Sequence, residues 1–245
     1  AGLVHKTMYP GVDPTLYVYA PEGPELQDHL ARIKGYNNRV EAPTAWIPKV
    51  YAGEDYLQKM LQEQPGNVMM VAGKNDQKID YILKALGQGI HVYADKPLVI
   101  DFVGYQKLKE AYYTAAKGLL DAKSDALLVE TTQDLLQAKA AVNGCRQAIE
   151  EVDFDVVLIA QVTVETTGTM LLGSEIGAAL NALEPLEIDL IGLNCATGPA
   201  EMSEHLRYLS KFANCAISVM PNAGLPILGA KGAEYPLGPK ELADA

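Results

Sequence analysis

The sequence is poor in cysteine, in positive charge and in long apolar runs. Its 245 residues include 3 cysteines, and 20 Lys and Arg against 31 Asp and Glu give a formal net charge of −11. Phosphate backbones and anionic lipid repel such a chain unless a basic patch intervenes, and the sequence shows no such patch. The opening AGLVHKTMYPG lacks the apolar core of a signal peptide, and no apolar run is long enough to span a membrane. We therefore expect a cytoplasmic protein that binds neither nucleic acid nor membranes.

The cysteines Cys145, Cys195 and Cys215 are too few and too scattered for a disulfide framework, and none of them forms a C-x-x-C pair. Reduced thiols are expected. Cys195 differs from the other two because the stretch DLIGLNCATGPAEM places it where an apolar strand pattern gives way to a helical one.

What the sequence does contain is a regular alternation of short apolar runs with helical patterns, which is typical of βα units around a parallel sheet. Any domain boundary is placed within a long helix predicted over about Asp101–Lys123, and the Gly- and Pro-rich end from Leu228 is predicted to be a loop with a final turn. Eight strands are predicted, at Leu16–Ala20, Ile47–Tyr51, Val68–Ala72, His91–Ala94, Ala126–Glu130, Val156–Val164, Asp189–Asn194 and Ala216–Met220.

The predicted fold class is therefore α/β with eight βα-type units. Eight parallel strands are the number that closes a (β/α)8 barrel, and a barrel-like single domain is preferred. An open doubly wound parallel sheet is the alternative.

Four successive predicted strands in the second half of the chain end in polar residues. They are Glu130, Thr163 with Glu165, Asn194 with Cys195, and Asn222. The carboxyl ends of parallel strands share one edge of the sheet, so these side chains could line a pocket for a small molecule. The alternative, that strand ends are polar because they meet water, stays open.

Four stretches of the second half carry a resemblance to a known family. ALLVETTQDLLQAKAA, QVTVETTGTMLLGSEIGAAL, IGLNCATGPAEMSEHLRYLS and VMPNAGLPILGAKGAEYPL resemble the homocysteine-binding barrel domain of cobalamin-dependent methionine synthase, over about residues 116–237. In that family the cysteine of the GLNC motif, here Cys195, is one of three thiolates that hold a catalytic zinc. Zinc with three protein ligands keeps a fourth position for the substrate thiol and lowers its pKa.

The resemblance also implies two adjacent cysteines in a later Gly-rich motif, and this chain ends before such a motif. Cys145 is predicted to lie in a helix and Cys215 at the opposite end of a strand from Cys195, so neither replaces the family's ligands. A single thiolate binds zinc weakly. Cys195 is therefore expected to be one inherited ligand without a bound metal.

The first half resembles a different family. GNVMMVAGKNDQKIDYILKALGQGIHVYADKPLVID is similar to the nucleotide-binding domain of the glucose-fructose oxidoreductase and inositol dehydrogenase family, over about residues 1–115. The resemblance implies that Lys96 of the DKP motif sits beside a nicotinamide and its substrate. The first strand and the Gly-rich turn that hold the pyrophosphate in that family have no counterpart here.

Three functional hypotheses follow. The first, which is the preferred one, is an engineered or computationally generated chimera, in which a Rossmann-derived segment (1–115) and a methyltransferase-barrel-derived segment (116–245) merge into one α/β domain with no intact active site, no cofactor and no enzyme activity. The second is a homocysteine S-methyltransferase (methionine synthase) fragment that uses Glu130, Glu165, Asn194, Asn222 and, with zinc, Cys195. The third is an NAD(P)-dependent oxidoreductase remnant that relies on Lys96. Apolar surface left by missing neighbours would favour self-association.

Overall fold

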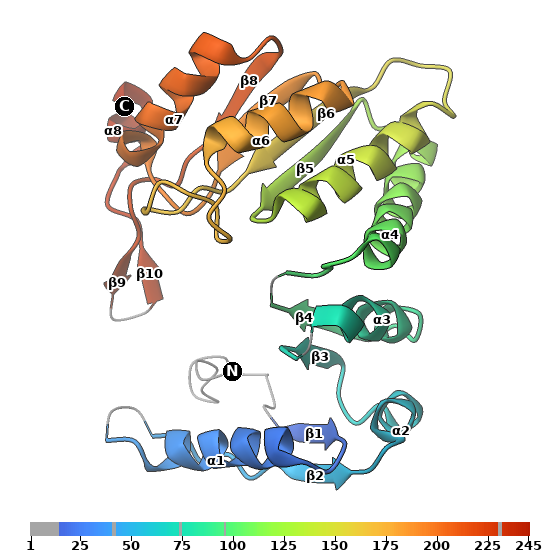
Figure 1. Cartoon of the computed structure of the whole chain (residues 1–245). Coiled ribbons are helices and arrows are strands. Elements are labelled where there is room, and N and C mark those ends of the chain that lie inside the picture. The colour runs from blue at the N-terminus through green and yellow to red at the C-terminus, as the bar shows by residue number, and fades with distance from the viewer. Residues whose placement is uncertain (1–14, 41–42, 74, 96, 230–231) are drawn as a thin grey trace. The chain divides into compact units, whose positions relative to one another are not determined.

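The computed structural model describes residues 15–40, 43–73, 75–95, 97–229 and 232–245 (Figure 1). Their contacts divide the chain into two compact units. One unit holds the described residues up to Gly73 together with Asp80–Ala94, and the other holds those of 74–79 and 95–245. Each unit is described separately below.

The first unit contains two parallel strand pairs. β1 pairs with β2 and β3 pairs with β4, each over four residues. Its small core contains Val18, Leu26 and Ile33, against which Trp46 packs. The elements of this unit are β1 (Tyr17–Ala20), α1 (Pro24–Asn38), β2 (Lys49–Ala52), α2 (Tyr56–Glu63), β3 (Val68–Val71), most of α3 (Asn75–Leu86) and β4 (His91–Ala94).

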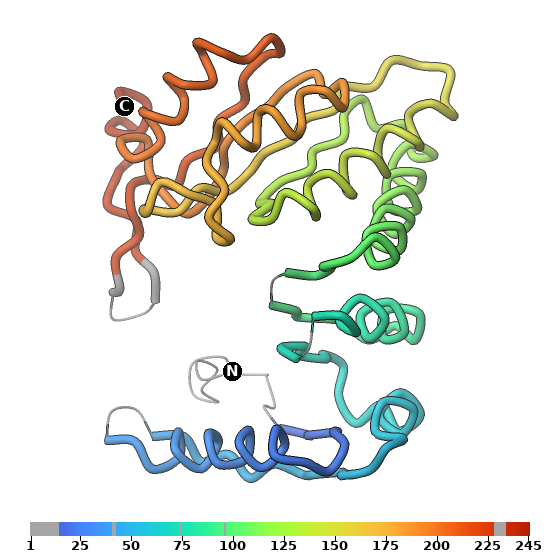
Figure 2. Tube along the Cα trace, in the orientation of Figure 1, coloured from blue at the N-terminus to red at the C-terminus, as the bar shows by residue number. Residues whose placement is uncertain are grey.

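The second unit is built around a four-stranded parallel sheet in the order β5-β6-β7-β8. Figure 2 shows how the chain alternates between strand and helix through this unit, from α4 to α7. Its elements are α4 (Phe102–Asp121), β5 (Ala126–Thr132), α5 (Leu135–Ile149), β6 (Val157–Val162), α6 (Ile176–Leu183), a short 3-10 helix η1 (Glu184–Leu186), β7 (Leu190–Asn194), α7 (Pro199–Phe212), β8 (Ala216–Met220), β9 (Ile227–Gly229), β10 (Gly232–Glu234) and α8 (Pro239–Asp244).

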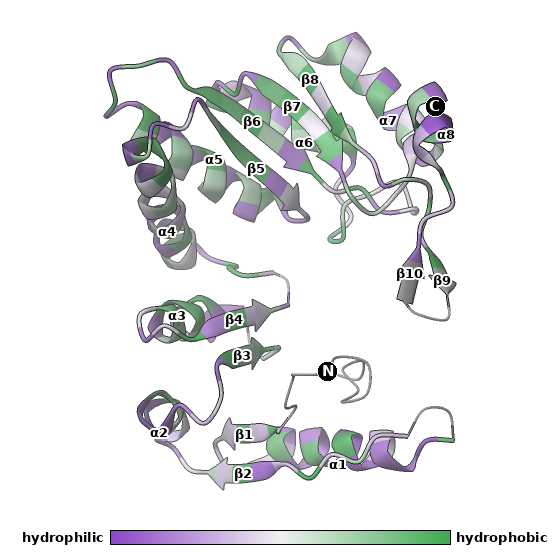
Figure 3. Ribbon diagram, turned by 180° about the vertical axis from the view of Figure 1, so that it is seen from behind, coloured by the Kyte–Doolittle hydropathy of each residue, from purple (hydrophilic) through white to green (hydrophobic). Residues whose placement is uncertain are grey.

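The strand register assigns side chains to the two faces of this sheet, because successive residues of a strand point to opposite faces. Leu127, Leu158 and Ile191 belong to the buried core, which they share with residues of α5, α6 and α7. The alternate residues Leu128, Ile159 and Leu190 are paired in register and lie on the other face. We call that other face the bare face, because within this unit no described helix covers it (Figure 3).

Helix α4 packs closely against α5. A Cβ atom added to Gly144 of α5 would lie 2.6 Å from the carbonyl oxygen of Lys109 and 2.8 Å from the backbone nitrogen of Tyr113. Only glycine allows this approach. The start of α4 is fixed by Asp101, whose side chain accepts a hydrogen bond from the backbone nitrogen of Gly104 at 2.7 Å.

The structure confirms the α/β class, the eight predicted strands and the long helix, which runs from Phe102 to Asp121. Among the described residues, β1 pairs with β2 in one sheet and β3 with β4 in a second. Strands β5 to β8 form a third sheet. Barrel closure, the open doubly wound alternative and the division of the chain into segments of different origin stay predictions.

The predicted C-terminal loop is corrected by the structure. It contains an antiparallel pair, β9 with β10, followed by the short helix α8. Pairing between strands three residues long leaves too little apolar pattern for the sequence to reveal them. Among the described residues, every helix is too short or too polar to cross a membrane.

Candidate functional site

The carboxyl edge of the β5–β8 sheet collects the polar residues that the sequence indicated. Glu130 lies near the end of β5, Asn194 is the last residue of β7, and Cys195 follows Asn194. Glu165 and Asn222 come shortly after β6 and β8. Because these four strands are parallel and adjacent, all five residues belong to the same edge, as predicted. Their role in binding stays a prediction.

Asn194 is the centre of a hydrogen-bond network at this edge. Its Nδ2 donates to Glu130 Oε2 at 2.8 Å and to Thr131 Oγ1 at 2.6 Å, and its Oδ1 accepts from the Thr131 backbone nitrogen at 2.9 Å. Asn194 is buried, with 5% of its surface exposed, whereas Glu130 is exposed. The buried Asn194 therefore fixes the position of the exposed Glu130 carboxylate.

The backbone at this edge is strained at three places. Thr131, Cys195 and Ala196 have φ angles of 55°, 60° and 57°, in the left-handed region that residues with a Cβ rarely adopt. For the β-branched Thr131 the cost is highest, and a register shift between Val129 and Thr132 accompanies it. Such strain tends to gather at functional sites, where the surrounding contacts maintain it.

Backbone hydrogen bonds tie the loops after β7 and β8 together. Cys195 N donates to Met220 O at 3.2 Å, and Asn222 N donates to Thr197 O at 3.0 Å. The loop after β6 is connected to β5 by Gln133, whose Nε2 donates to Glu165 Oε1 at 3.2 Å. The strand ends and loops that carry the predicted residues are thus connected to one another by hydrogen bonds.

The three cysteines are free thiols in different surroundings. Cys195 is exposed, while Cys145 is buried in α5, where burial raises its pKa to about 11. Cys215 precedes β8 and so lies at the amino edge of the sheet, opposite Cys195, and burial raises its pKa as well. Both placements agree with the sequence prediction.

A zinc ion in a protein is held by three or four side chains that lie close together. Within the described residues, no group of three or more His, Cys, Asp or Glu side chains is close enough together to hold a metal ion. Cys145 lies in α5 and Cys215 at the opposite edge of the sheet, so neither accompanies Cys195 as a ligand. The described residues do not fit the three-thiolate site that the resemblance implies, and we derive no chemical step through a metal.

Lys96, the residue predicted for nicotinamide chemistry, lies outside the described residues. Its neighbour Asp95 forms an ion pair with Lys78, whose side chain is fully buried, and the Lys78 Nζ also donates to Asp95 O at 3.2 Å. These contacts stabilise the chain after β4.

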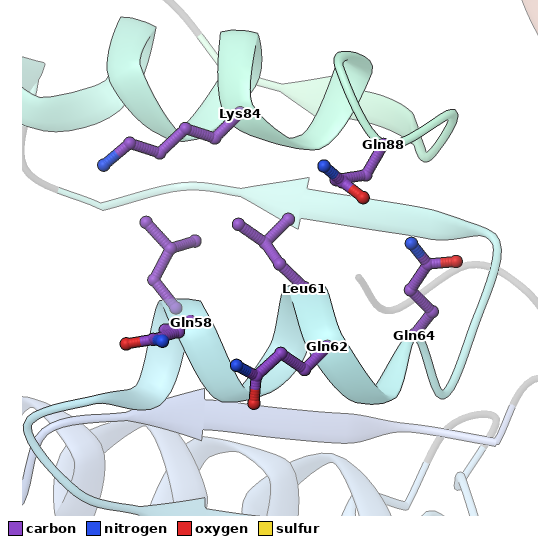
Figure 4. Close-up of a pocket in the computed structure, with 7 residues that line it drawn as sticks. Gln58, Leu61, Gln62, Gln64, Lys84 and Gln88 are labelled. Atoms are coloured by element: carbon purple, nitrogen blue, oxygen red, sulfur yellow. The ribbon is translucent and has the colours of Figure 1, made fainter.

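A cavity of about 630 Å³ lies in the first unit, between α2 and the end of α3 (Figure 4). None of the predicted site residues lines it, and its walls carry four carboxamides but no carboxylate, thiol or imidazole. Four glutamines and the single Lys84, with no carboxylate, thiol or imidazole beside them, offer little chemistry, so we place the candidate site at the carboxyl edge instead. The lining residues are Leu57, Gln58, Leu61, Gln62, Gln64, Lys84 and Gln88.

Sequence reasoning missed three residues of this edge, Thr131, Gln161 and Ser218. Gln161 Nε2 donates to Ser218 Oγ at 2.8 Å, although the two residues are 57 positions apart. One signal for Gln161 was present, because it is the polar residue inside the apolar run VVLIAQV. Thr131 and Ser218 carried no comparable signal.

Carboxylates, a carboxamide and a thiol gather at the carboxyl ends of the parallel strands, and this is the edge at which α/β proteins commonly bind their ligands. The family model described as homocysteine S-methyltransferase matches residues 51–245. The chain belongs to this family.

Two curated relatives are similar to this chain over most of its length. Methionine synthase from Mycobacterium tuberculosis (strain ATCC 25618 / H37Rv) is 60% identical over 173 residues, which are 71% of this chain and 14% of that protein. Methionine synthase from Mycobacterium leprae (strain TN) is 60% identical over 165 residues, which are 67% of this chain and 13% of that protein. The chain therefore spans a small part of these relatives.

A solved chain from Parabacteroides merdae ATCC 43184, provisionally described as an oxidoreductase, is 50% identical over 44% of this chain and 24% of its own, with a TM-score of 0.41. A TM-score this low gives no support to a shared fold. The Rossmann resemblance of residues 1–115 and the role of Lys96 stay predictions.

The comparisons favour the second functional hypothesis over the first. The matched range 51–245 contains all of the segment 116–237 and begins inside the segment assigned to the dehydrogenase resemblance. They give no support to an engineered chimera without an active site, which was the preferred hypothesis.

Proposed function

We propose that the carboxyl edge of the β5–β8 sheet binds homocysteine and that the chain is the homocysteine-binding part of a methyltransferase. The observation that carries this proposal is the network in which Asn194 holds Glu130 and Thr131 next to the strained loop of Cys195. Membership of the homocysteine S-methyltransferase family supports the choice of substrate.

The chemistry of the edge suits an amino-acid thiol. Homocysteine carries an ammonium group, whose N–H donors pair well with carboxylate acceptors. Glu130 is exposed and oriented by Asn194, and Glu165 is oriented by Gln133. These residues bind and orient the substrate, while the exposed Cys195 marks the position of the substrate sulfur in the family's arrangement.

Calorimetric titration of the full chain with L-homocysteine tests the proposal. We expect saturable binding and about a tenfold loss of affinity in Glu130→Gln, because one charge-assisted hydrogen bond is replaced by a neutral one of the same shape. Glu204→Gln is the matched control, since Glu204 is an exposed residue of α7 paired with Arg207. Absence of binding, or equal affinity in the two variants, contradicts the proposal.

Methyl transfer itself is the second part of the proposal. It is measured as methionine formed from homocysteine when the full chain is incubated with methylcobalamin as the methyl donor. We expect turnover to depend on Glu130, with unchanged activity in Glu204→Gln. Binding without turnover would support the substrate site and contradict the catalytic part.

A further inference from the structure

Gln161 lies on the bare face of the β5–β8 sheet. The strand register places Gln161 of β6, Gly192 of β7 and Ser218 of β8 in one row across three strands. Leu158, Ala160 and Val162, the alternate residues of β6, belong to the core beneath the helices. Gln161 therefore points away from that core.

Gly192, in the middle of this row, leaves the space between Gln161 and Ser218 free of a side chain. A Cβ atom at this position would overlap the carbonyl oxygen of Ser218, so the two strands can approach here only with glycine. Because Gly192 has no side chain, the carboxamide of Gln161 crosses the central strand, and its Nε2 donates to Ser218 Oγ at 2.8 Å. This bond fixes the orientation of the carboxamide.

Two buried polar atoms of β6 and its carboxyl end have no hydrogen-bond partner among the residues that the structure describes. They are Oε1 of Gln161 and Oγ1 of Thr163, and both residues are 0% exposed. Thr163 has the same strand parity as Gln161 and lies two residues nearer the carboxyl edge. Buried polar atoms are nearly always paired, so two unpaired ones on one face indicate a group that is supplied from outside the chain.

The charge of the surrounding loops shows what kind of group this is. The segments 130–134, 163–175, 195–198 and 221–226, which follow β5 to β8, contain four carboxylates and no Lys, Arg or His. An acceptor-rich edge without a cation matches a ligand that brings positive charge and several N–H donors. A primary ammonium group has both.

We propose that Gln161 and Thr163 recognise the ammonium group of the amino-acid thiol and determine specificity for it. This inference rests on the function proposed above and deepens it. The ammonium donates to Gln161 Oε1 and Thr163 Oγ1, while the Glu130 carboxylate on the same edge supplies the opposite charge. Both acceptors are fully buried, so the ligand reaches them only if the side chains that cover them are displaced.

The test compares two ligands on the full chain by calorimetry, homocysteine and its des-amino analogue γ-sulfanylbutyric acid. The wild-type chain is expected to bind homocysteine at least about tenfold more tightly, because a site that pairs with a donor rejects the analogue lacking it. Gln161→Met, which keeps the size of the side chain, should weaken homocysteine binding to the level of the analogue and leave the analogue unaffected.

Two further variants complete the design. Thr163→Val removes the hydroxyl with little change of shape. It should also reduce the difference in affinity between homocysteine and its des-amino analogue. Gln137→Met is the matched control, because Gln137 lies on α5 and bonds to Tyr112 instead of facing the bare face. Gln137→Met should retain the affinity difference between the two ligands that the wild-type chain shows. Circular dichroism checks that each variant is folded.

The outcomes separate this inference from the proposed function. If the wild-type chain binds neither ligand, the proposed function fails and this inference fails with it. If the wild-type chain binds homocysteine but Gln161→Met and Thr163→Val weaken both ligands equally, only this inference is overturned, and the two residues are structural.

Discussion

The carboxamide of Asn194 forms hydrogen bonds with both the backbone and the side chain of Thr131. Its Oδ1 accepts from the Thr131 nitrogen at 2.9 Å and its Nδ2 donates to the Thr131 hydroxyl at 2.6 Å, across 63 positions of sequence. Thr131 has a φ of 55°, which a β-branched residue avoids unless its surroundings impose it. The strand end of β5 therefore depends on a side chain of β7.

Asn194→Ala should lower the free energy of unfolding by about 2 kcal/mol, because a buried network loses three hydrogen bonds and leaves polar partners unpaired. Urea denaturation measures the loss. Asn143→Ala is the comparison, since Asn143 donates to Tyr105 and to a helix carbonyl, and alanine favours the helix in return. Equal losses in the two variants would show that Asn194 has no special role.

Two glycine substitutions should have opposite signs. Gly192→Ala forces a Cβ onto the Ser218 carbonyl and should destabilise the chain by about 3 kcal/mol. Gly118→Ala, within α4, meets no atom within 4 Å and should stabilise it by about 0.5–1 kcal/mol through helix propensity. Thermal and urea unfolding of both variants provide the measurement, and a mild effect at Gly192 would contradict the close strand approach.

Thiol labelling should distinguish the three cysteines. In the native chain at about pH 8, iodoacetamide should modify the exposed Cys195 first, because the thiolate reacts and must be accessible. Cys145 is buried with a pKa of about 11, so it should react only after unfolding. Peptide mass spectrometry over a time course shows the order in which the cysteines are labelled. Rapid labelling of native Cys145 would mean that α5 does not pack as described.

Stability should depend on pH through Glu184. Its carboxylate accepts from the Asn214 backbone nitrogen at 2.5 Å and from Asn214 Nδ2 at 3.0 Å, and these bonds lower the pKa of Glu184 below its ordinary value of 4.5. A lowered pKa in the folded state adds stability above the ordinary pKa, and this stability is lost as the pH falls through the folded-state pKa.

The variant Glu184→Gln tests this dependence. Its midpoint of thermal unfolding should lie below that of the wild type near neutral pH, and this gap should narrow as the pH falls below 4.5. Glu204→Gln should show little difference at either pH, because the exposed pair with Arg207 contributes little. A gap for Glu184→Gln that is constant with pH would rule out the carboxylate as its source.

Prediction from sequence succeeded where the signal was local. The strands His91–Ala94 and Ala216–Met220 were predicted to the residue, because short apolar runs bounded by polar residues need no distant partner to be recognised. The shared edge of Glu130, Asn194 and Cys195 followed from the parallel βα alternation.

The remaining features could not be derived from sequence. The bond from Gln161 to Ser218 depends on the β6-β7-β8 register and on Gly192 between them. The grouping of β1 to β8 into separate sheets depends on which edges meet, and no residue pattern specifies this. Lys96 was selected from a motif alone, and its surroundings lie outside the described residues.

The sequence by itself determined the α/β class, the approximate positions of the strands along the chain, and the polar character of their carboxyl ends, since these follow from periodicity within one segment. Only the tertiary structure decided that Asn194 holds Thr131 and that Gln161 crosses Gly192 to reach Ser218. Hydrogen-bond partners far apart in the chain are selected by strand register, and register is set by how the whole sheet packs against its helices.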